Sequence, residues 1–250
     1  MCNFMGFRVS RVKFIELKQV EKELGTLAAL GVLTNGFDYG TSAVLKKKDI
    51  NDFEIVNMHW EFIPTGTRSM EQVAAARKQG IPWLNATSER LLDSKMFREA
   101  ALTRRCLVLA SHFYEWRGFK PAGEKKDKKY PYIISLAERE YFYIAGIWNP
   151  FTDRNTGETF DSFAIVTTKA NQLMEEIHNS KKRQPTILTD NLAWEWMMGD
   201  LSEERIKEIA SFQMPSEYFA AHTIAKDFKL LEDPTAEFEY AELPPLETAI

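Results

Sequence analysis

The chain of 250 residues lacks the features that mark membrane, secreted and metal-binding proteins. No apolar run approaches the ~20 residues that span a bilayer. The N-terminal stretch MCNFMGFRVSRVKF lacks the apolar segment of about 7–15 residues that a secretory signal requires. Only two cysteines occur, Cys2 and Cys106, which make no disulfide framework and no pair with zinc-ligand spacing. We therefore expect a cytoplasmic protein with no membrane span, no metal and no cofactor.

Net charge is also small, but it is unevenly distributed along the chain. The whole sequence carries −4, whereas residues 200–250 hold 12 Asp and Glu against 4 Lys and Arg, which leaves +4 for the remainder. A mildly basic body is compatible with a groove that follows the phosphates of a nucleic acid. The last forty residues are acidic and punctuated by proline, so we expect an acidic arm at about 213–250 that extends over the body.

The order of apolar and polar residues predicts one α+β domain over residues 1–250. No repeat, low-complexity tract or linker divides the chain, and 44% hydrophobic residues provide a sizeable core. Short strands alternate with helices in no regular βαβ rhythm, which favours a mostly antiparallel sheet. We expect strands at 53–63, 105–116, 130–138, 140–148, 160–168 and near 187, and helices at 11–24 (ended by Gly25), 88–102 (capped by Ser88), 169–178, 191–198 and 202–212.

Cys2 is the first candidate for chemistry because of its position. A Met-Cys start is a common substrate for removal of the initiator methionine, which leaves an α-amine and a thiol on adjacent carbons. The α-amine has an unperturbed pKa of ~7.7–8, against ~10.4 for lysine, so a useful fraction of it is unprotonated near neutral pH. It can condense with an aldehyde to an imine, and the thiolate can then close a five-membered thiazolidine. Cys106 lies in the apolar run CLVLA and is expected to be a buried hydrophobe.

Three further polar residues stand out, each with a structural alternative. Asn85, in WLNATSE, is either a site residue or a turn or cap residue. Glu115 lies between two aromatic residues after an apolar run, where a carboxyl group is expected to have a raised pKa and to act as an acid and base; a salt bridge at a strand end is the alternative. His178, just before NSKKRQP, is a proton shuttle or a cap at the C-terminus of a helix.

Seven motifs occur in an order that resembles one known family. The combination of a Met-Cys start, an Asn-Ala-x-Ser-Glu box, a Tyr-Glu-Trp box and a Thr-Thr…His…Pro box is specific, although each motif alone is weak. The set resembles the SRAP family, the SOS-response-associated peptidases that cross-link abasic sites, over residues 1 to about 198. The motifs are MCNF, WEFIP (60–64), LNATSE (84–89), RCLVLASHFYEW (105–116), AGIW (145–148), TTKAN (167–171) and IHNSKKRQPTIL (177–188).

The resemblance implies a site and a fold. Cys2 would be the covalent residue, Asn85 would orient it, Glu115 would move protons during imine formation and ring closure, and His178 would assist opening of the deoxyribose ring. The implied fold has two twisted, mainly antiparallel sheets that form a barrel-like core flanked by helices. The implied partner is single-stranded DNA with an abasic site, bound by a monomer that associates with the nucleoid when on DNA.

The sequence departs from the family pattern at two positions that carry arginine in relatives. Asn3 and Phe4 replace Gly-Arg after the first cysteine, and Thr87 replaces the arginine of the Asn-Ala-Arg-Ser-Glu box. Two lost phosphate contacts would reduce the salt dependence of binding by roughly 0.7 each. Candidate DNA contacts are Arg8, Trp60, Ser88, Arg90, Trp116, Lys181, Lys182 and Arg183; the tryptophans would stack on bases or pack in the core.

Three functions are open at this point. The first is a suicide cross-linker that captures abasic sites through Cys2, shields them during replication and, because the chemistry is reversible, acts as a slow lyase in reverse. The second is a thiol peptidase with Cys2 as nucleophile and His178 or Glu115 as base, which would explain removal of its own leading residue. The third is a non-catalytic nucleic-acid-binding module. His59, His112 and His222 form no metal constellation and are expected to be structural.

Overall fold

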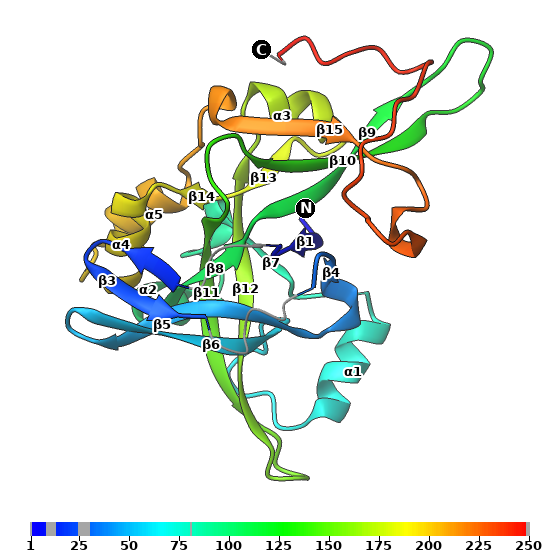
Figure 1. Ribbon diagram of the computed structural model, residues 1–250. Helices are drawn as coiled ribbons and strands as arrows, with labels where there is room; N and C mark the ends of the chain where they lie inside the picture. The colour runs from blue at the N-terminus through cyan, green and yellow to red at the C-terminus, as the bar shows by residue number, and fades with distance from the viewer. Residues whose placement is uncertain (1, 9–13, 25–30, 81, 249–250) are drawn as a thin grey trace.

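The computed structural model describes residues 2–8, 14–24, 31–80 and 82–248, and its centre is a closed five-stranded barrel (Figure 1). Each strand of the ring pairs with the next, and the last pairs back onto the first. In order around the ring the strands are β12 (Thr159–Lys169), β6 (Asp52–Trp60), β5 (Thr41–Asp49), β8 (Arg105–Ala110) and β11 (Phe142–Thr152). Strands β12 and β6 run parallel, and all other neighbouring pairs in the ring are antiparallel.

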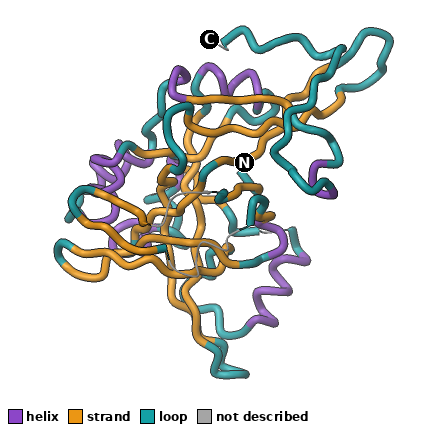
Figure 2. The backbone as a smooth tube through the Cα atoms, in the orientation of Figure 1, coloured by secondary structure: helices purple, strands orange, loops and turns teal. Residues whose placement is uncertain are grey.

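Short strands extend this barrel, and a second, five-stranded sheet lies beside it. The ribbon of β9 and β10 projects beyond the body, and the N-terminal strand β1 lies in the middle of the molecule (Figures 1 and 2). The extensions of the barrel are β7 (Asn85–Thr87), β13 (Arg183–Pro185) and β14 (Ile187–Leu188). The second sheet runs β15 (Phe219–Thr223), β10 (Lys128–Leu136), β9 (His112–Phe119), β1 (Phe4–Gly6) and β4 (Thr34–Asn35).

Ser111 is the corner at which the chain leaves the barrel for the second sheet. It separates β8 from β9, and it also holds the N-terminal strand in place. Its N–H donates to the carbonyl oxygen of Gly6 (2.9 Å), and its hydroxyl accepts from the N–H of Arg8 (2.8 Å). Any side chain at Gly6 would collide with the carbonyl of Val32 and the ring of His112, so only glycine permits this approach. The corner therefore fixes where the first residues of the chain lie.

The two faces of the barrel strands contribute to two apolar clusters. One cluster packs the barrel against α2, α4, α5 and the hairpin of β2 and β3, and contains Trp196 and Ile206. The other packs it against the second sheet and α3, and contains Phe113, Ile177 and Cys2 itself. The helices are α1 (Met70–Lys78), α2 (Arg98–Thr103), α3 (Gln172–Ile177), α4 (Asp190–Met198) and α5 (Glu203–Ala210), and the hairpin strands are β2 (Phe14–Leu17) and β3 (Val20–Glu23).

The expected α+β class, the barrel-like core of two mainly antiparallel sheets and the flanking helices are confirmed. One expected helix, at 11–24, is wrong. Residues 14–17 and 20–23 form the β2–β3 hairpin, and the turn places Lys18 at φ 59°. The buried side chains Ile15 and Leu17 alternate with exposed ones, which is the period of a strand. Residues 11–13 and Gly25 lie outside the described part of the chain.

Two other expectations are corrected. The predicted helix at 88–102 is a single 3-10 turn at Ser88–Arg90 followed by the short α2, and the residue at the N-cap of the turn is Thr87 rather than Ser88. The predicted strand at 105–116 is two strands in different sheets. Within the expected acidic arm, β15 pairs with β10, and the following segment runs back along the β9–β10 ribbon. Among the described residues, no helix is long and apolar enough to cross a membrane.

Candidate active site at the N-terminal strand

Cys2 lies in the apolar cluster between the barrel and the second sheet, immediately before β1. Its side chain is 1% exposed, and its thiol points to the carbonyl oxygen of Phe4 at 3.6 Å. Burial raises the pKa of this thiol far above its usual value, and the nearby carboxyl group of Glu115 raises it further. The thiol is therefore neutral as it stands, and it needs a base to become a nucleophile.

Glu115 is the buried carboxyl group whose charge acts on this thiol. It lies on β9 opposite Tyr132 of β10, and its side chain is buried among apolar residues. Burial raises the pKa of the Glu115 carboxyl group to about 7, and the cations Lys181 and Lys129 act in the opposite direction. The expected raised pKa is thus confirmed. A carboxyl group with a pKa near neutrality exists in both protonation states at physiological pH, as acid–base catalysis requires.

His178 stands beside Glu115 at the C-cap of α3, so its expected cap position is confirmed. Its Nδ1 lies 2.8 Å from the carbonyl oxygen of Arg183 and 3.5 Å from Oε1 of Glu115. The carbonyl oxygen of Arg183 can only accept a hydrogen bond, so the neutral ring carries its hydrogen on Nδ1 and its lone pair on Nε2. Burial lowers the pKa of His178 to about 4, which keeps the ring neutral at pH 7.

Asn85 contacts the first residues of the chain through the side chain of Asn3. It lies in β7, which pairs with β12 in parallel, and not in the turn or cap given as its structural alternative. Its Nδ2 donates to Oδ1 of Asn3 at 3.0 Å, and its own Oδ1 is buried without a hydrogen-bond partner among the described residues. A buried amide oxygen without a donor is costly, so this atom is suited to receive an N–H from a group that enters the site.

The structure also accounts for one of the two departures from the family pattern. Phe4 is buried, and its ring meets the indole of Trp116 edge-on at 5.2 Å between ring centroids. The ammonium group of Lys229 lies 4.1 Å from the centre of the Phe4 ring. A cation therefore still lies beside position 4, although it comes from the C-terminal segment rather than from the N-terminal strand. Trp116 remains partly exposed next to Glu115.

The other predicted DNA contacts fall into two groups. Base stacking is wrong for Trp60, because its ring is fully buried and its Nε1 donates to the carbonyl of Leu84 at 3.1 Å. Ser88 is buried as well. The guanidinium of Arg183 is engaged by both carboxylate oxygens of Glu89 at 3.0 Å. The exposed candidates are Arg90, Lys181, Lys182 and Arg8, of which Arg8 is paired with Asp233 at 3.0 Å and Lys182 with Glu175 at 3.1 Å.

Two residues of the site had no signal in the sequence. Asn3 is the residue that Asn85 contacts, and it had been considered only as the replacement of a glycine. Lys129, at the start of β10, is a cation that acts on both Glu115 and His178. In the sequence it lies in a lysine-rich stretch, residues 120–129, that resembles a solvated loop. Only the pairing of β9 with β10 brings it next to the site, and no local pattern reports that pairing.

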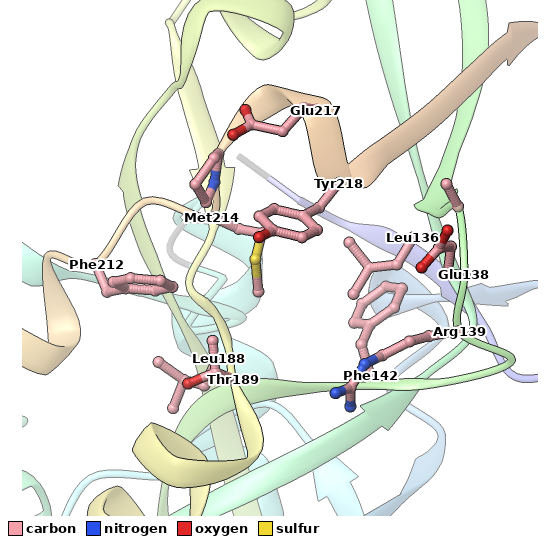
Figure 3. Close-up of a pocket in the computed structure, with 12 residues that line it drawn as sticks. Leu136, Glu138, Arg139, Phe142, Leu188, Thr189, Phe212, Met214, Glu217 and Tyr218 are labelled. Carbon is pink, nitrogen blue, oxygen red and sulfur yellow. The ribbon is translucent and has the colours of Figure 1, made fainter.

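A separate cavity of about 850 Å³ lies away from these residues (Figure 3). The side chains of Phe142, Met214 and Tyr218 converge on it, with Arg139 and Glu138 at its rim. No cysteine or histidine lines it, and the Arg139 guanidinium is already paired with Asp190 at 2.6 Å. The described residues also contain no group of three His, Cys, Asp or Glu side chains that would hold a metal ion. The reactive groups are therefore concentrated at the N-terminal strand.

Comparison with known proteins identifies the family. The family model of the SOS response associated peptidases (SRAP) matches residues 32–229. The chain belongs to the SRAP family. It is 32% identical over 140 residues to the abasic site processing protein YoqW of Bacillus subtilis (strain 168), and 30% identical over 146 residues to the abasic site processing protein YedK of Escherichia coli (strain K12). The alignments cover 56% and 58% of this chain, and span 55% and 61% of the relatives.

Solved structures share the fold. A crystal structure of a protein from Bacteroides thetaiotaomicron is similar with a TM-score of 0.71 and 30% identity, over 82% of both chains. One from Bordetella bronchiseptica has a TM-score of 0.67 at 21% identity, covering 90% of this chain and 100% of that chain, and shows the fold alone. The SRAP barrel and second sheet described above are thus shared with proteins of known structure.

Proposed function

We propose that this SRAP protein captures abasic sites in single-stranded DNA by forming a thiazolidine with Cys2 after removal of Met1. The observation that carries the proposal is the burial of the Cys2 thiol near the carboxyl group of Glu115, whose pKa is about 7. The ring of His178 contacts this carboxyl group, with 3.5 Å between Nδ1 and Oε1. The names of the relatives, abasic site processing proteins, support the same substrate. The proposal places a monomer in the cytoplasm, on single-stranded DNA exposed during replication.

The chemistry uses Glu115 first as an acid and then as a base. His178 takes the proton of the C1′ hydroxyl through Nε2 and returns it to O4′ as the C1′–O4′ bond breaks, which opens the deoxyribose ring to its aldehyde. The α-amine of Cys2, oriented by Oδ1 of Asn85, attacks the aldehyde carbon; one amine proton moves to the oxygen, protonated Glu115 donates a second, and the oxygen leaves as water from an iminium ion. The Glu115 carboxylate then takes the thiol proton as sulfur bonds to the iminium carbon, which gives a neutral thiazolidine and restores protonated Glu115. Every step is reversible, so the same groups can release the aldehyde again.

The test is cross-linking of the processed protein to a short single strand with one abasic site. Intact mass first verifies that Met1 has been removed. A denaturing gel then shows a covalent band that requires the abasic site and disappears in Cys2→Ala. The matched control is Cys106→Ala, because Cys106 is the other cysteine and is equally buried; this variant retains the band. Equal cross-linking by Cys2→Ala and the wild type would refute the proposal, as would retention of Met1 in cells.

A further inference from the structure

The turn that follows α3 is tied to strand β9 by one side chain. Asn179, the residue after His178, donates from Nδ2 to the carbonyl oxygen of Gly118 at 2.7 Å and accepts from the N–H of Gly118 at 3.0 Å. The carboxamide thus pairs with a backbone residue as a neighbouring strand would. A Cβ atom at Gly118 would lie 3.3 Å from Oδ1 of Asn179, so glycine leaves the room that this approach requires.

The position of this pair in the two segments gives it a functional meaning. Gly118 lies three residues after Glu115 on β9, and Asn179 directly follows His178. The carbonyl of His178 accepts from the N–H of Lys182 at 2.8 Å, which closes the turn tightly around the histidine. His178 can therefore move away from Glu115 only if the turn deforms or the Asn179–Gly118 pair breaks.

We propose that Asn179 is a positioning residue that holds the His178 ring against Glu115 by clamping the α3 turn to β9. This inference rests on the proposed function, because it assigns a role in the same reaction. Asn179 itself is exposed, touches none of the reacting groups and makes no contribution to the buried core. Its clamp also fixes the surroundings of the pair, namely Lys181 on the same turn and Lys129, which is opposite Gly118 on β10.

The first arm of the test separates positioning from DNA binding. Asn179→Ala removes both bonds, whereas Asn179→Asp has the same size but replaces the donor by a charged acceptor that repels the carbonyl oxygen of Gly118. With saturating abasic DNA, both variants form the adduct more slowly, by roughly tenfold for alanine, because part of the effect of a positioned acid–base group is lost. The affinity for intact single strands and the thermal midpoint stay at wild-type values. The control is Asn57→Ala, an exposed asparagine on β6. An unchanged rate, or a rate loss matched by a loss of affinity or stability, overturns the inference.

The second arm does not depend on cross-linking. His178 is one of four histidines, so its ring signals can be followed by NMR as the pH is lowered. In the free wild-type protein its pKa is about 4 because the ring is buried, and the cations Lys181 and Lys129 lower it further, while Glu115 lies 3.5 Å from Nδ1. In Asn179→Ala this pKa rises towards 6.5, since a loosened ring regains water. An unmoved His178 titration refutes the clamp, whereas absence of adduct in the wild type alone refutes only the proposed function.

Discussion

Replacement of Glu115 by glutamine tests the central electrostatic claim without any DNA. Glutamine has the shape of a protonated glutamate and carries no charge, so Glu115→Gln isolates the cost of ionising a buried carboxyl group. The pKa of Glu115 is about 7 in the folded protein, because of burial, against an ordinary value of 4.5. Since each pKa unit corresponds to ~1.36 kcal/mol, full ionisation costs the native state roughly 3 kcal/mol.

The sign of the effect depends on pH. Below pH 4.5 the carboxyl group is protonated in both the folded and the unfolded chain, and wild type and Glu115→Gln have the same free energy of unfolding. As the pH rises through 4.5 the unfolded chain loses its proton first, so the wild type loses stability until the folded-state pKa of about 7 is passed. Above that value we expect the variant to be more stable than the wild type by roughly 3 kcal/mol.

Urea unfolding at about pH 4.5, 6.5 and 8.5 measures this difference. His178 and His112, whose pKa values are both lowered to about 4 by burial, destabilise the protein as the pH falls from 6.5 towards 4. They do so in wild type and variant alike, so their contribution cancels except for coupling between His178 and residue 115. A stability difference that does not change with pH, or a variant that is less stable at every pH, would show that the carboxyl group is not held in its neutral form.

Three other substitutions test the frame around the site. Arg105→Met destabilises the fold by about 2–4 kcal/mol in urea, because the buried guanidinium donates to carbonyls at the ends of α2 and α4, while the cross-linking rate is unchanged; wild-type stability would contradict this role. Gly6→Ala displaces β1 and abolishes cross-linking in a protein whose barrel still unfolds cooperatively, since Val32 and His112 leave no room for a Cβ; normal adduct formation would refute the corner argument. Lys181→Ala lowers the slope of log K against log salt by roughly 0.7 for single strands, as measured by fluorescence anisotropy; an unchanged slope excludes Lys181 from phosphate contact.

The sequence was sufficient where local pattern and chemistry agree. Strand β12 and helix α4 were anticipated within a few residues because the order of apolar and polar residues marks them. The raised pKa of Glu115 was anticipated because an apolar run on one side and aromatic neighbours on both predict burial. The corner at Ser111 was not, because Ser111 and His112 carry no turn signal such as glycine or proline and the run from 105 to 116 resembles one strand. What divides it is the N-terminal strand, which occupies the hydrogen bonds of Ser111 from more than a hundred residues away.

The sequence also failed to predict the roles of polar residues that depend on tertiary contacts. Asn179 and Lys129 lie in segments that resemble solvated loops, and nothing in either segment predicts that they bracket His178 and Glu115. At Trp60 the sequence left base stacking and core packing open, and the structure decides for the core, because the barrel buries the ring completely. Resemblance of motifs therefore suggested the candidate reactive side chains, while the surrounding contacts could be assigned only from the three-dimensional arrangement.

Burial of the site and its proposed chemistry follow from the same property, which is that every reactive group can be neutral near pH 6–7. The Cys2 thiol has a raised pKa, His178 has a lowered one, and Glu115 is half protonated near pH 7. Charged groups in this apolar cluster would cost several kcal/mol each, so neutrality is what permits the cluster to form at all. Because Glu115 lies close to its midpoint, moving one proton from the thiol or to a departing oxygen requires little free energy from the carboxyl side. The burial that makes the Glu115 carboxyl group destabilise the fold at neutral pH therefore also suits this group to exchange protons with the Cys2 thiol.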